Sequence, residues 1–325
     1  MIDVLLYNEK EHGFWDDFVH QANNGTIFHE RKFINYHPKG RFKDHSLIFM
    51  EKGKPVALFP AVEFKDGSKR ILYSHRGSSY GGIVQPINQG VEKNVKIVKA
   101  LGEYAKDQSF DSIIMTLPPD IYNHQLNNYL EFACFREGYT YVKREISSVL
   151  KLEDDIDKNL AKFKSTHRTA YRRGEKMGVK VRETDDYKAF YAILKNNLKI
   201  RHGVEPTHTL DELLDLKKLY PEQIRLYGAY LDKTMIAGIV MFDANKLVTL
   251  AFYISHNEEF QEYRGVNVLF KEVIADSIKR GFHYLDFGIF TVNMEPNYGL
   301  ARFKESFGSG GVFRDTLRLE LTKDN

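Results

Sequence analysis

The side chains best suited to chemistry lie near the end of the chain, where a carboxylate and an amine stand among apolar residues. Asp286 lies inside the alternating apolar run Tyr284–Phe287, which predicts a short strand. A carboxylate there is costly to desolvate unless it is paired or hydrogen-bonded. Lys304 stands between two phenylalanines, ahead of a glycine-rich turn, and this setting suits an anionic ligand. The alternative is a structural pair of Asp286 and Lys304 beside a flexible loop.

A glycine-rich segment in the first half of the chain could also hold an anion. Residues 75–83 contain three glycines, several hydroxyl groups and Arg76, and they follow a strand expected at Arg70–Ser74. The backbone amides that such a loop exposes bind phosphate or carboxylate groups, although an ordinary turn has a similar composition. Tyr80 in this loop and Tyr253 in the second half are candidates for positioning a substrate.

The most basic stretch of the chain covers residues 158–176. As a helix, it places Lys164, Arg168 and Arg172 at successive i, i+4 positions on one face. Like charges in this arrangement repel one another, and an anionic ligand would relieve the repulsion. A solvated basic face is the alternative. Two other anion-suited segments in the same chain favour phosphate or carboxylate binding here.

The composition is that of a globular protein. The 325 residues include 23 Phe and 19 Tyr, and the net charge of +3 is too small for a dedicated nucleic-acid binder. Cys134 is the single cysteine, so no disulfide can form within the chain and a reducing compartment is favoured. Early charges argue against a signal peptide, and no apolar run approaches the roughly 18 residues that span a bilayer. We therefore expect a cytoplasmic protein.

Two halves of the chain follow the same order of expected elements. Residues 46–117 and 224–287 each contain two hairpin strands about a short charged turn, a third strand, a loop with glycine, an amphipathic helix and another strand. Strands joined by helices in this order predict mixed α/β layers. We expect an α/β fold with mixed sheets, made of two similar domains, residues 1–152 and residues 153–325, with a ligand-binding cleft between them.

Several element boundaries bear on the site. The pattern predicts one strand over Pro55–Phe64 and a long strand over Tyr139–Leu152. It predicts a helix over Val268–Arg280 and a polar loop through Asn297–Gly299, and it ends the second domain's last element at Gly308.

Five segments together carry a resemblance to a known family: Tyr80–Gly82, Ser165–Val179, Gly265–Asn267, Asp286–Gly288 and, as the most specific, Gly299–Gly308. With them the chain resembles the FemABX peptidoglycan-bridge transferases and their relatives, which are built from two GNAT-like (acyl-CoA N-acyltransferase-like) domains. The resemblance covers nearly the whole chain.

The resemblance implies transfer of an acyl or aminoacyl group to an amine of a cell-wall or nucleotide-sugar precursor. It implies that Lys304 contacts the transferred group or a phosphate, and that Arg168 and Arg172 bind phosphates of the acceptor. No tightly bound cofactor is implied, and acyl-CoA or aminoacyl-tRNA would be the co-substrate. The expected partners are therefore a small anionic precursor, such as a nucleotide sugar or a muropeptide, and tRNA.

The expected cofactor loop departs from the family pattern. GNAT proteins resemble one another in a Gln/Arg-x-x-Gly-x-Gly/Ala loop, whose backbone amides grip the pyrophosphate of coenzyme A. Here the loop is Glu262-Tyr-Arg-Gly-Val-Asn267, in which Gly265 fits and Glu262 would repel a pyrophosphate. Gly265 and Asn267 are the expected cofactor-binding residues, and the departure weakens the case for acetyl-CoA.

The expected mechanism is attack of an acceptor amine on an ester or thioester carbonyl. It needs a neutral amine, a proton acceptor and positive charge near the developing oxyanion. We hypothesise that Asp286, or a water that it holds, assists the amine and that Lys304 stabilises the anion. No Ser-His-Asp or Cys-His arrangement stands out, and the spacing of His and Cys suggests no metal site, so direct transfer is favoured.

Two alternatives to this function stay open. One is an acyl-CoA-dependent N-acetyltransferase that acts on an amino sugar. The other is a non-catalytic GNAT-like module that binds an anionic glycan precursor, because a fold can keep its binding groove without turnover.

Overall fold

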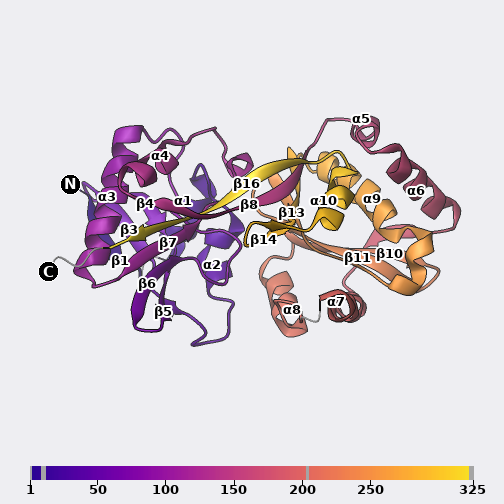
Figure 1. The fold of residues 1–325 in the computed structure, drawn as a ribbon, viewed down its shortest axis with the longest axis horizontal. Helices are drawn as coiled ribbons and strands as arrows, with labels where there is room; N and C mark the ends of the chain where they lie inside the picture. The colour runs from indigo at the N-terminus through magenta and orange to yellow at the C-terminus, as the bar shows by residue number, and fades with distance from the viewer. Residues whose placement is uncertain (1, 9–11, 203–204, 322–325) are drawn as a thin grey trace. The chain divides into compact units, whose positions relative to one another are not determined.

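The computed structural model describes residues 2–8, 12–202 and 205–321. Contacts within the chain divide it into two units. Unit 1 contains the described residues of Met1–Glu145 and Phe313–Asn325, and unit 2 contains those of Ile146–Val312. Both units combine helices with parallel and antiparallel strands (Figure 1), which confirms the expected mixed α/β class.

Unit 1 has two sheets. A small antiparallel sheet pairs β1 (Asp3–Leu6), β3 (Leu47–Glu51) and β4 (Lys54–Phe59). Neighbouring strands of the larger sheet follow the order β2 (Lys43–Asp44), β5 (Val62–Asp66), β6 (Lys69–Ser74), β7 (Ser112–Thr116) and β16 (Gly310–Glu320). The helical elements of this unit are α1 (His12–Gln21), η2 (Ile27–His29), α2 (Arg31–Ile34), α3 (Val91–Asp107), η3 (Asp120–Tyr122) and α4 (Tyr129–Arg136).

The single strand expected over Pro55–Phe64 is wrong, because the chain changes sheets at Pro60. β4 pairs with β3, whereas β5 pairs with β6. Proline has no N–H with which to continue a ladder, so a strand readily ends there. The carbonyl of Pro60 instead accepts the hydroxyl of Ser74 at 2.5 Å. The break leaves the hairpin of β3 and β4 in the small sheet and places β5 in the larger one.

Unit 2 is built on one run of neighbouring strands: β8 (Thr140–Lys151), β13 (Tyr284–Ile289), β12 (Val248–His256), β11 (Thr234–Asp243), β10 (Ile224–Leu231) and β9 (Lys180–Glu183). A separate hairpin pairs β14 (Thr291–Val292) with β15 (Glu295–Pro296). The helical elements are α5 (Ile156–Ala161), α6 (Ser165–Lys176), α7 (Tyr187–His202), α8 (Leu210–Leu219), η4 (Glu258–Tyr263), α9 (Gly265–Lys279) and α10 (Tyr298–Glu305). None of the described helices has both the length and the apolarity needed to cross a membrane.

Each unit contains a strand–helix–strand crossover that sets two parallel strands side by side. In unit 1, α3 joins β6 to the parallel β7, and in unit 2, α9 joins β12 to the parallel β13. The crossover is the part of the expected repetition that residues 46–117 and 224–287 share. The strands before it differ, because β3, β4, β5 and β6 precede α3 whereas β10, β11 and β12 precede α9. The apolar faces of the two helices are buried, with Ile97, Val98 and Leu101 on α3 and Leu269, Val273 and Ile274 on α9.

The second parallel strand of each crossover pairs with a strand from the other half of the sequence. β7 pairs antiparallel with β16, and β13 pairs antiparallel with β8. The expected domains, residues 1–152 and 153–325, therefore differ from the observed units. The boundary lies inside β8, and residues 313–321 belong to unit 1. Pairing decides to which unit a strand belongs, and β16 follows the second half of the chain while its partner β7 lies in the first.

Two further boundaries near the site differ from the expected ones. The single helix over residues 158–176 is interrupted, because α6 begins afresh with Lys164 at its N-cap position. The amide of Lys164 donates to the carbonyl of Ser306 at 2.9 Å instead of continuing α5. The polar loop expected at Asn297–Gly299 opens α10, since the side chain of Asn297 caps the helix by accepting from the amide of Leu300.

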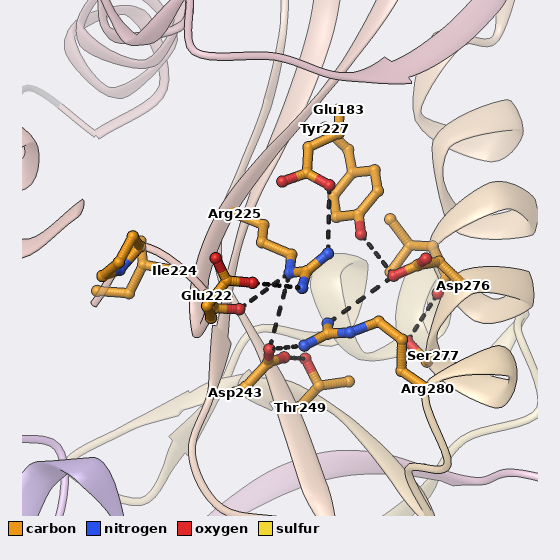
Figure 2. A network of polar contacts seen from close by, with 12 residues as sticks. Glu183, Glu222, Ile224, Arg225, Tyr227, Asp243, Thr249, Asp276, Ser277 and Arg280 are labelled. Carbon is orange, nitrogen blue, oxygen red and sulfur yellow. Dashed lines mark hydrogen bonds and ion pairs between the residues drawn. The ribbon is translucent and has the colours of Figure 1, made fainter. Parts of the chain in front are cut away.

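A polar network ties the C-terminal end of α9 to the neighbouring strands of unit 2 (Figure 2). Arg280 forms ion pairs with Asp243 on β11 and with Asp276 on α9. Asp243 is 5% exposed and also accepts the hydroxyl of Thr249 at 2.8 Å, while Tyr227 on β10 donates to Asp276 at 2.6 Å. Burial raises the pKa of Asp243, and the hydrogen bond from Arg280 opposes that rise. The network thus holds the crossover helix against β10 and β11.

We predict that Arg280→Met lowers the free energy of unfolding by about 3 kcal/mol, because it leaves the buried Asp243 carboxylate with only the longer ion pair to Arg225, whose Nε is 4.0 Å away. Urea denaturation checks this. Adding Asp243→Asn to the same variant should recover part of the loss. As a control, Lys158→Met removes an exposed i, i+4 pair with Asp154 and should unfold at the same urea concentration as the wild type. The prediction is contradicted if the Arg280→Met protein is as stable as the wild type.

Candidate active site

Unit 2 contains a cavity of about 620 Å³ between the C-terminal half of β12, the start of α9 and α10. The parallel strands β12 and β13 pair at three positions, from Val248 opposite Tyr284 to Leu250 opposite Asp286, and both strands continue past the last of them. The apolar residues that line the cavity lie on β11, β12, η4, α9 and α10. They are Ile236, Ile254, Phe260, Val266, Leu300 and Phe303. The polar ones are His167, Asn197, His256, Gln261, Arg264, Asn267 and Asn297.

The start of α9 forms one wall of the cavity. Arg264 occupies the N-cap position in the left-handed conformation, with φ of 56°, and Gly265 begins the helix. A Cβ on Gly265 would lie 3.2 Å from the side chains of Ile236 and Ala237, so glycine lets the helix start close to β11. The first backbone N–H groups of a helix have no partner within it, and they carry partial positive charge. This wall is therefore electropositive.

No acidic side chain is among the described residues that line the cavity. Glu262, which was expected to repel a pyrophosphate, is exposed and does not line it. Gln261 and Arg264 of the same segment do. The repulsion inferred from Glu262 therefore does not act from the cavity wall, and Arg264 supplies a positive charge there.

His167 reaches the cavity from α6, which packs closely on α9. A Cβ on Gly174 of α6 would lie 2.7 Å from the carbonyl of Tyr263 and from Val268, so this glycine permits the approach of the two helices. The half-buried ring of His167 lies beside Asn267, whose side-chain nitrogen is 2.9 Å from Nδ1. Burial lowers the pKa of His167, and the nearby charges of Lys164 and Arg264 lower it further. His167 is therefore neutral at neutral pH.

The C-terminal half of β12 adds a second histidine to the wall. The side-chain nitrogen of Asn197 on α7 donates to the carbonyl of His256 at 3.0 Å. Nε2 of His256 lies 3.6 Å from the carboxylate of Glu258, which forms an ion pair when the ring is protonated. Together with the amide side chains, these groups give the cavity hydrogen-bonding capacity with little fixed charge other than that of Arg264.

Asp286 and Lys304 are buried and are not among the residues that line the cavity. Asp286 has no exposed surface, and its Oδ1 accepts the hydroxyl of Ser147 at 2.5 Å and the amide of Gly288 at 2.7 Å. Lys304 is 2% exposed and donates to the carbonyls of Gly288 and Ile289 at 2.7 and 2.8 Å. Burial lowers the pKa of Lys304 to about 8, against the opposite effect of Asp286. Both side chains hold the end of β13, and neither lines the cavity.

The three other candidates in unit 2 also lie outside the lining. Arg168 donates to the carbonyls of Ala161 and Phe163, so it caps the end of α5. Arg172 is exposed, and its guanidinium lies 5.7 Å from the ring centroid of Tyr171. The hydroxyl of Tyr253 lies 2.7 Å from Nδ1 of His208, and burial raises its pKa to about 12. Phosphate binding by Arg168 and Arg172 stays a prediction.

Tyr80 and Arg76 belong to unit 1. Tyr80 is 3% exposed, and its hydroxyl donates to that of Tyr122 at 3.2 Å inside an aromatic cluster. The guanidinium of Arg76 lies over the ring of Phe64, 3.7 Å from its centroid, on an exposed residue. Tyr80 is thus part of the packed interior, whereas Arg76 stays accessible to an anion.

Of the nine predicted site residues, Gly265 and Asn267 line the cavity. Four polar lining residues were not predicted from the sequence: His167, Asn197, His256 and Arg264. Two signals were available, because Arg264 lies inside the loop compared with the GNAT pattern and His167 directly precedes Arg168. Asn197 and His256 carry no local signal, since only the packing of α7 on β12 brings them to one place. Among the described residues, no group of three or more His, Cys, Asp or Glu side chains could hold a metal ion.

Comparisons with known proteins identify the fold. Residues 161–305 match the family model described as an acetyltransferase (GNAT) domain. The structure is similar to that of FemX, with a TM-score of 0.75 and 13% identity over 98% of this chain and 97% of that one. It is also similar to a tandem GNAT protein from the clavulanic acid biosynthesis pathway, with a TM-score of 0.58 and 12% identity over 100% of both chains.

A third similar structure is the C-terminal domain of a putative lysylphosphatidylglycerol synthetase from Agrobacterium fabrum. Its TM-score is 0.60, with 12% identity over 96% of this chain and 92% of that one. No curated protein matches the sequence. The likeness to FemX and to the tandem GNAT protein confirms the expected tandem GNAT-like fold.

We predict that Lys304→Met lowers the free energy of unfolding by about 2 kcal/mol, because two buried carbonyls lose their donor. The difference from the wild type should widen as the pH rises from 8 to 10.5. Folding lowers the pKa of Lys304 from 10.5 to about 8, so the unfolded chain binds more protons in this window and wild-type stability rises with pH. Urea denaturation at a series of pH values checks this. Parallel curves for the two proteins would contradict it.

Proposed function

We propose that the chain transfers an activated acyl or aminoacyl group to an amine. The observation that carries the proposal is the cavity between the C-terminal half of β12 and the start of α9, because its lining residues lie within the segment that matches a GNAT acetyltransferase domain. The similarity of the whole chain to FemX and to a tandem GNAT protein supports it at the level of fold.

The donor would bind with its phosphate-bearing carrier against the start of α9. Arg264 and the first N–H groups of the helix supply positive charge, and no described lining residue carries a negative one. These features favour acyl-CoA as the first donor to test, and aminoacyl-tRNA as the second. The apolar part of the wall, with Ile254, Leu300 and Phe303, would take up the acyl group or the carrier's apolar portion.

The reaction is direct attack on the carbonyl carbon. The amine nitrogen forms the new bond, the carbon–sulfur or carbon–oxygen bond of the donor breaks, and the amine's proton passes to water while the leaving group takes one up. An apolar, water-poor wall favours the neutral amine over its ammonium form. The neutral amine is the reactive state. In this proposal Asp286 and Lys304 do not contact the substrate. They fix the backbone at Gly288, where β13 ends and the segment that connects it to α10 begins.

The acceptor would be a small anionic precursor such as a nucleotide sugar or a muropeptide. Two accessible cations support this part of the proposal, namely Arg172 on α6 and Arg76 in unit 1. Each guanidinium is presented on an aromatic ring, which limits its conformational freedom before a phosphate arrives.

We predict that coenzyme A at a hundred times its dissociation constant adds about 2.7 kcal/mol of stability, which is several degrees in a thermal shift assay. Arg264→Ala should raise the dissociation constant about tenfold or more, because it removes a charged hydrogen-bond donor from the cavity. Lys233→Ala removes the same charge from the exposed turn between β10 and β11 and should bind coenzyme A as the wild type does.

The same thermal shift assay distinguishes between the candidate donors and acceptors. Stabilisation by a UDP-muropeptide, with none by coenzyme A, would replace acyl-CoA by aminoacyl-tRNA as the donor. Transfer of radiolabelled acetyl from acetyl-CoA to an amino sugar would instead establish the plain N-acetyltransferase. If neither coenzyme A, nor charged tRNA, nor the UDP-linked precursors alter the melting temperature, the proposed function is wrong.

A further inference from the structure

The imidazole of His167 is held in one tautomer. The side-chain nitrogen of Asn267 lies 2.9 Å from Nδ1, and an amide nitrogen can only donate, so Nδ1 is the acceptor. The proton of the neutral ring then lies on Nε2. The rings of Phe303 and Phe307 pack against the imidazole, with centroids 5.7 and 4.8 Å away. A residue that lines the cavity thus carries an oriented Nε2–H donor.

The charges that face this ring are both positive. Lys164 lies one turn before it at the start of α6, and Arg264 faces it from the start of α9. The neighbours from α9 and from the end of α10, namely Asn267, Phe303 and Phe307, are uncharged. A donor that is neutral itself and surrounded by cations favours an anionic oxygen over a neutral one as its partner.

We propose that His167 donates Nε2–H to a phosphoryl oxygen of the donor's carrier, and that Asn267 is the positioning residue that selects this tautomer. The inference rests on the proposed function, because it requires a phosphorylated ligand in the same cavity. Arg264 and His167 then play different roles in binding the ligand. Arg264 attracts an anion by charge, whereas the imidazole accepts only an oxygen that lies along its N–H direction.

Proton uptake on binding follows from this contact. A phosphoryl oxygen at hydrogen-bonding distance favours the protonated ring, so the pKa of His167 is higher in the complex than in the free protein. The added proton lies on Nδ1, and the side-chain amide of Asn267 must then turn its oxygen to that atom, because both nitrogens of an imidazolium donate. Affinity therefore increases as the pH falls through the higher of the two values. A glutamine at this position can place an amide N–H near the site of Nε2, but it does not titrate.

Isothermal titration with coenzyme A between pH 6 and pH 8 tests the contact. His167→Ala should raise the dissociation constant about tenfold at pH 6, the loss expected for one hydrogen bond to a charged acceptor. His167→Gln should bind within about threefold of the wild type at pH 8 and lack the wild type's additional gain at pH 6. The matched control is His283→Gln, at an exposed histidine outside the cavity lining. It should follow the wild type, which accounts for the titration of coenzyme A itself.

The tautomer is tested without any ligand. Two-bond ¹H–¹⁵N spectra of the imidazoles, with the His167 signals assigned by their loss in His167→Gln, should show the proton on Nε2. Asn267→Asp should move it to Nδ1, because a carboxylate accepts where the amide donates. A proton on Nδ1 in the wild type, or no preferred tautomer, overturns the inference whatever the function.

The binding outcomes separate the two proposals. If the wild type binds coenzyme A and His167→Ala binds it equally well, the inference about His167 is overturned and the proposed function stands. If the wild type binds neither coenzyme A nor charged tRNA, the proposed function is overturned, and the role of His167 with it.

Discussion

The site depends on how unit 2 holds the end of β13. Asp286 and Lys304 are both buried there, and each would be costly to desolvate alone. Asp286 accepts hydrogen bonds from the hydroxyl of Ser147 on β8 and from the amide of Gly288. Lys304 donates hydrogen bonds to the carbonyls of Gly288 and Ile289. These bonds satisfy the backbone just where β13 leaves its parallel partner β12. Space for a ligand can therefore open beside the strands without unpaired polar groups behind it.

The cavity combines walls that come from distant parts of the sequence, and its electrostatics follow from that combination. The start of α9 contributes Arg264 and the partial positive charge of a helix N-terminus, α6 contributes His167, and α10 contributes Phe303. The Asp243–Arg280 network secures the other end of α9 against the strands. One helix is thus fixed by ion pairs at its C-terminal end and presents its N-terminal end to a ligand, where the backbone's partial charge is positive.

Much of the fold was predictable from residue patterns. The amphipathic helices, the alternating strands and the crossover helix of each half required only local periodicity, and the motif from Gly299 to Gly308 indicated the family whose fold the chain shares. The same patterns failed where pairing crosses the chain. β16 follows a glycine-rich turn and was not expected, and Pro60 divides an apparently continuous strand between two sheets. The patterns also singled out Asp286 and Lys304 by their apolar neighbours, but they did not predict that both side chains bind the backbone at the end of β13.

The sequence by itself determined the α/β class and the crossover helix of each half, because both are encoded by residues close together in the chain. The helix expected from Val268 begins three residues earlier, at Gly265. Only the tertiary structure decided which polar side chains face a ligand. Lys304 and Asp286 turn inward because the carbonyls and hydroxyl that satisfy them lie in the interior. His167 meets Asn267, one hundred positions later, because Gly174 lets α6 approach α9. Local patterns record which groups need partners, whereas the packing of helices and strands determines where those partners are.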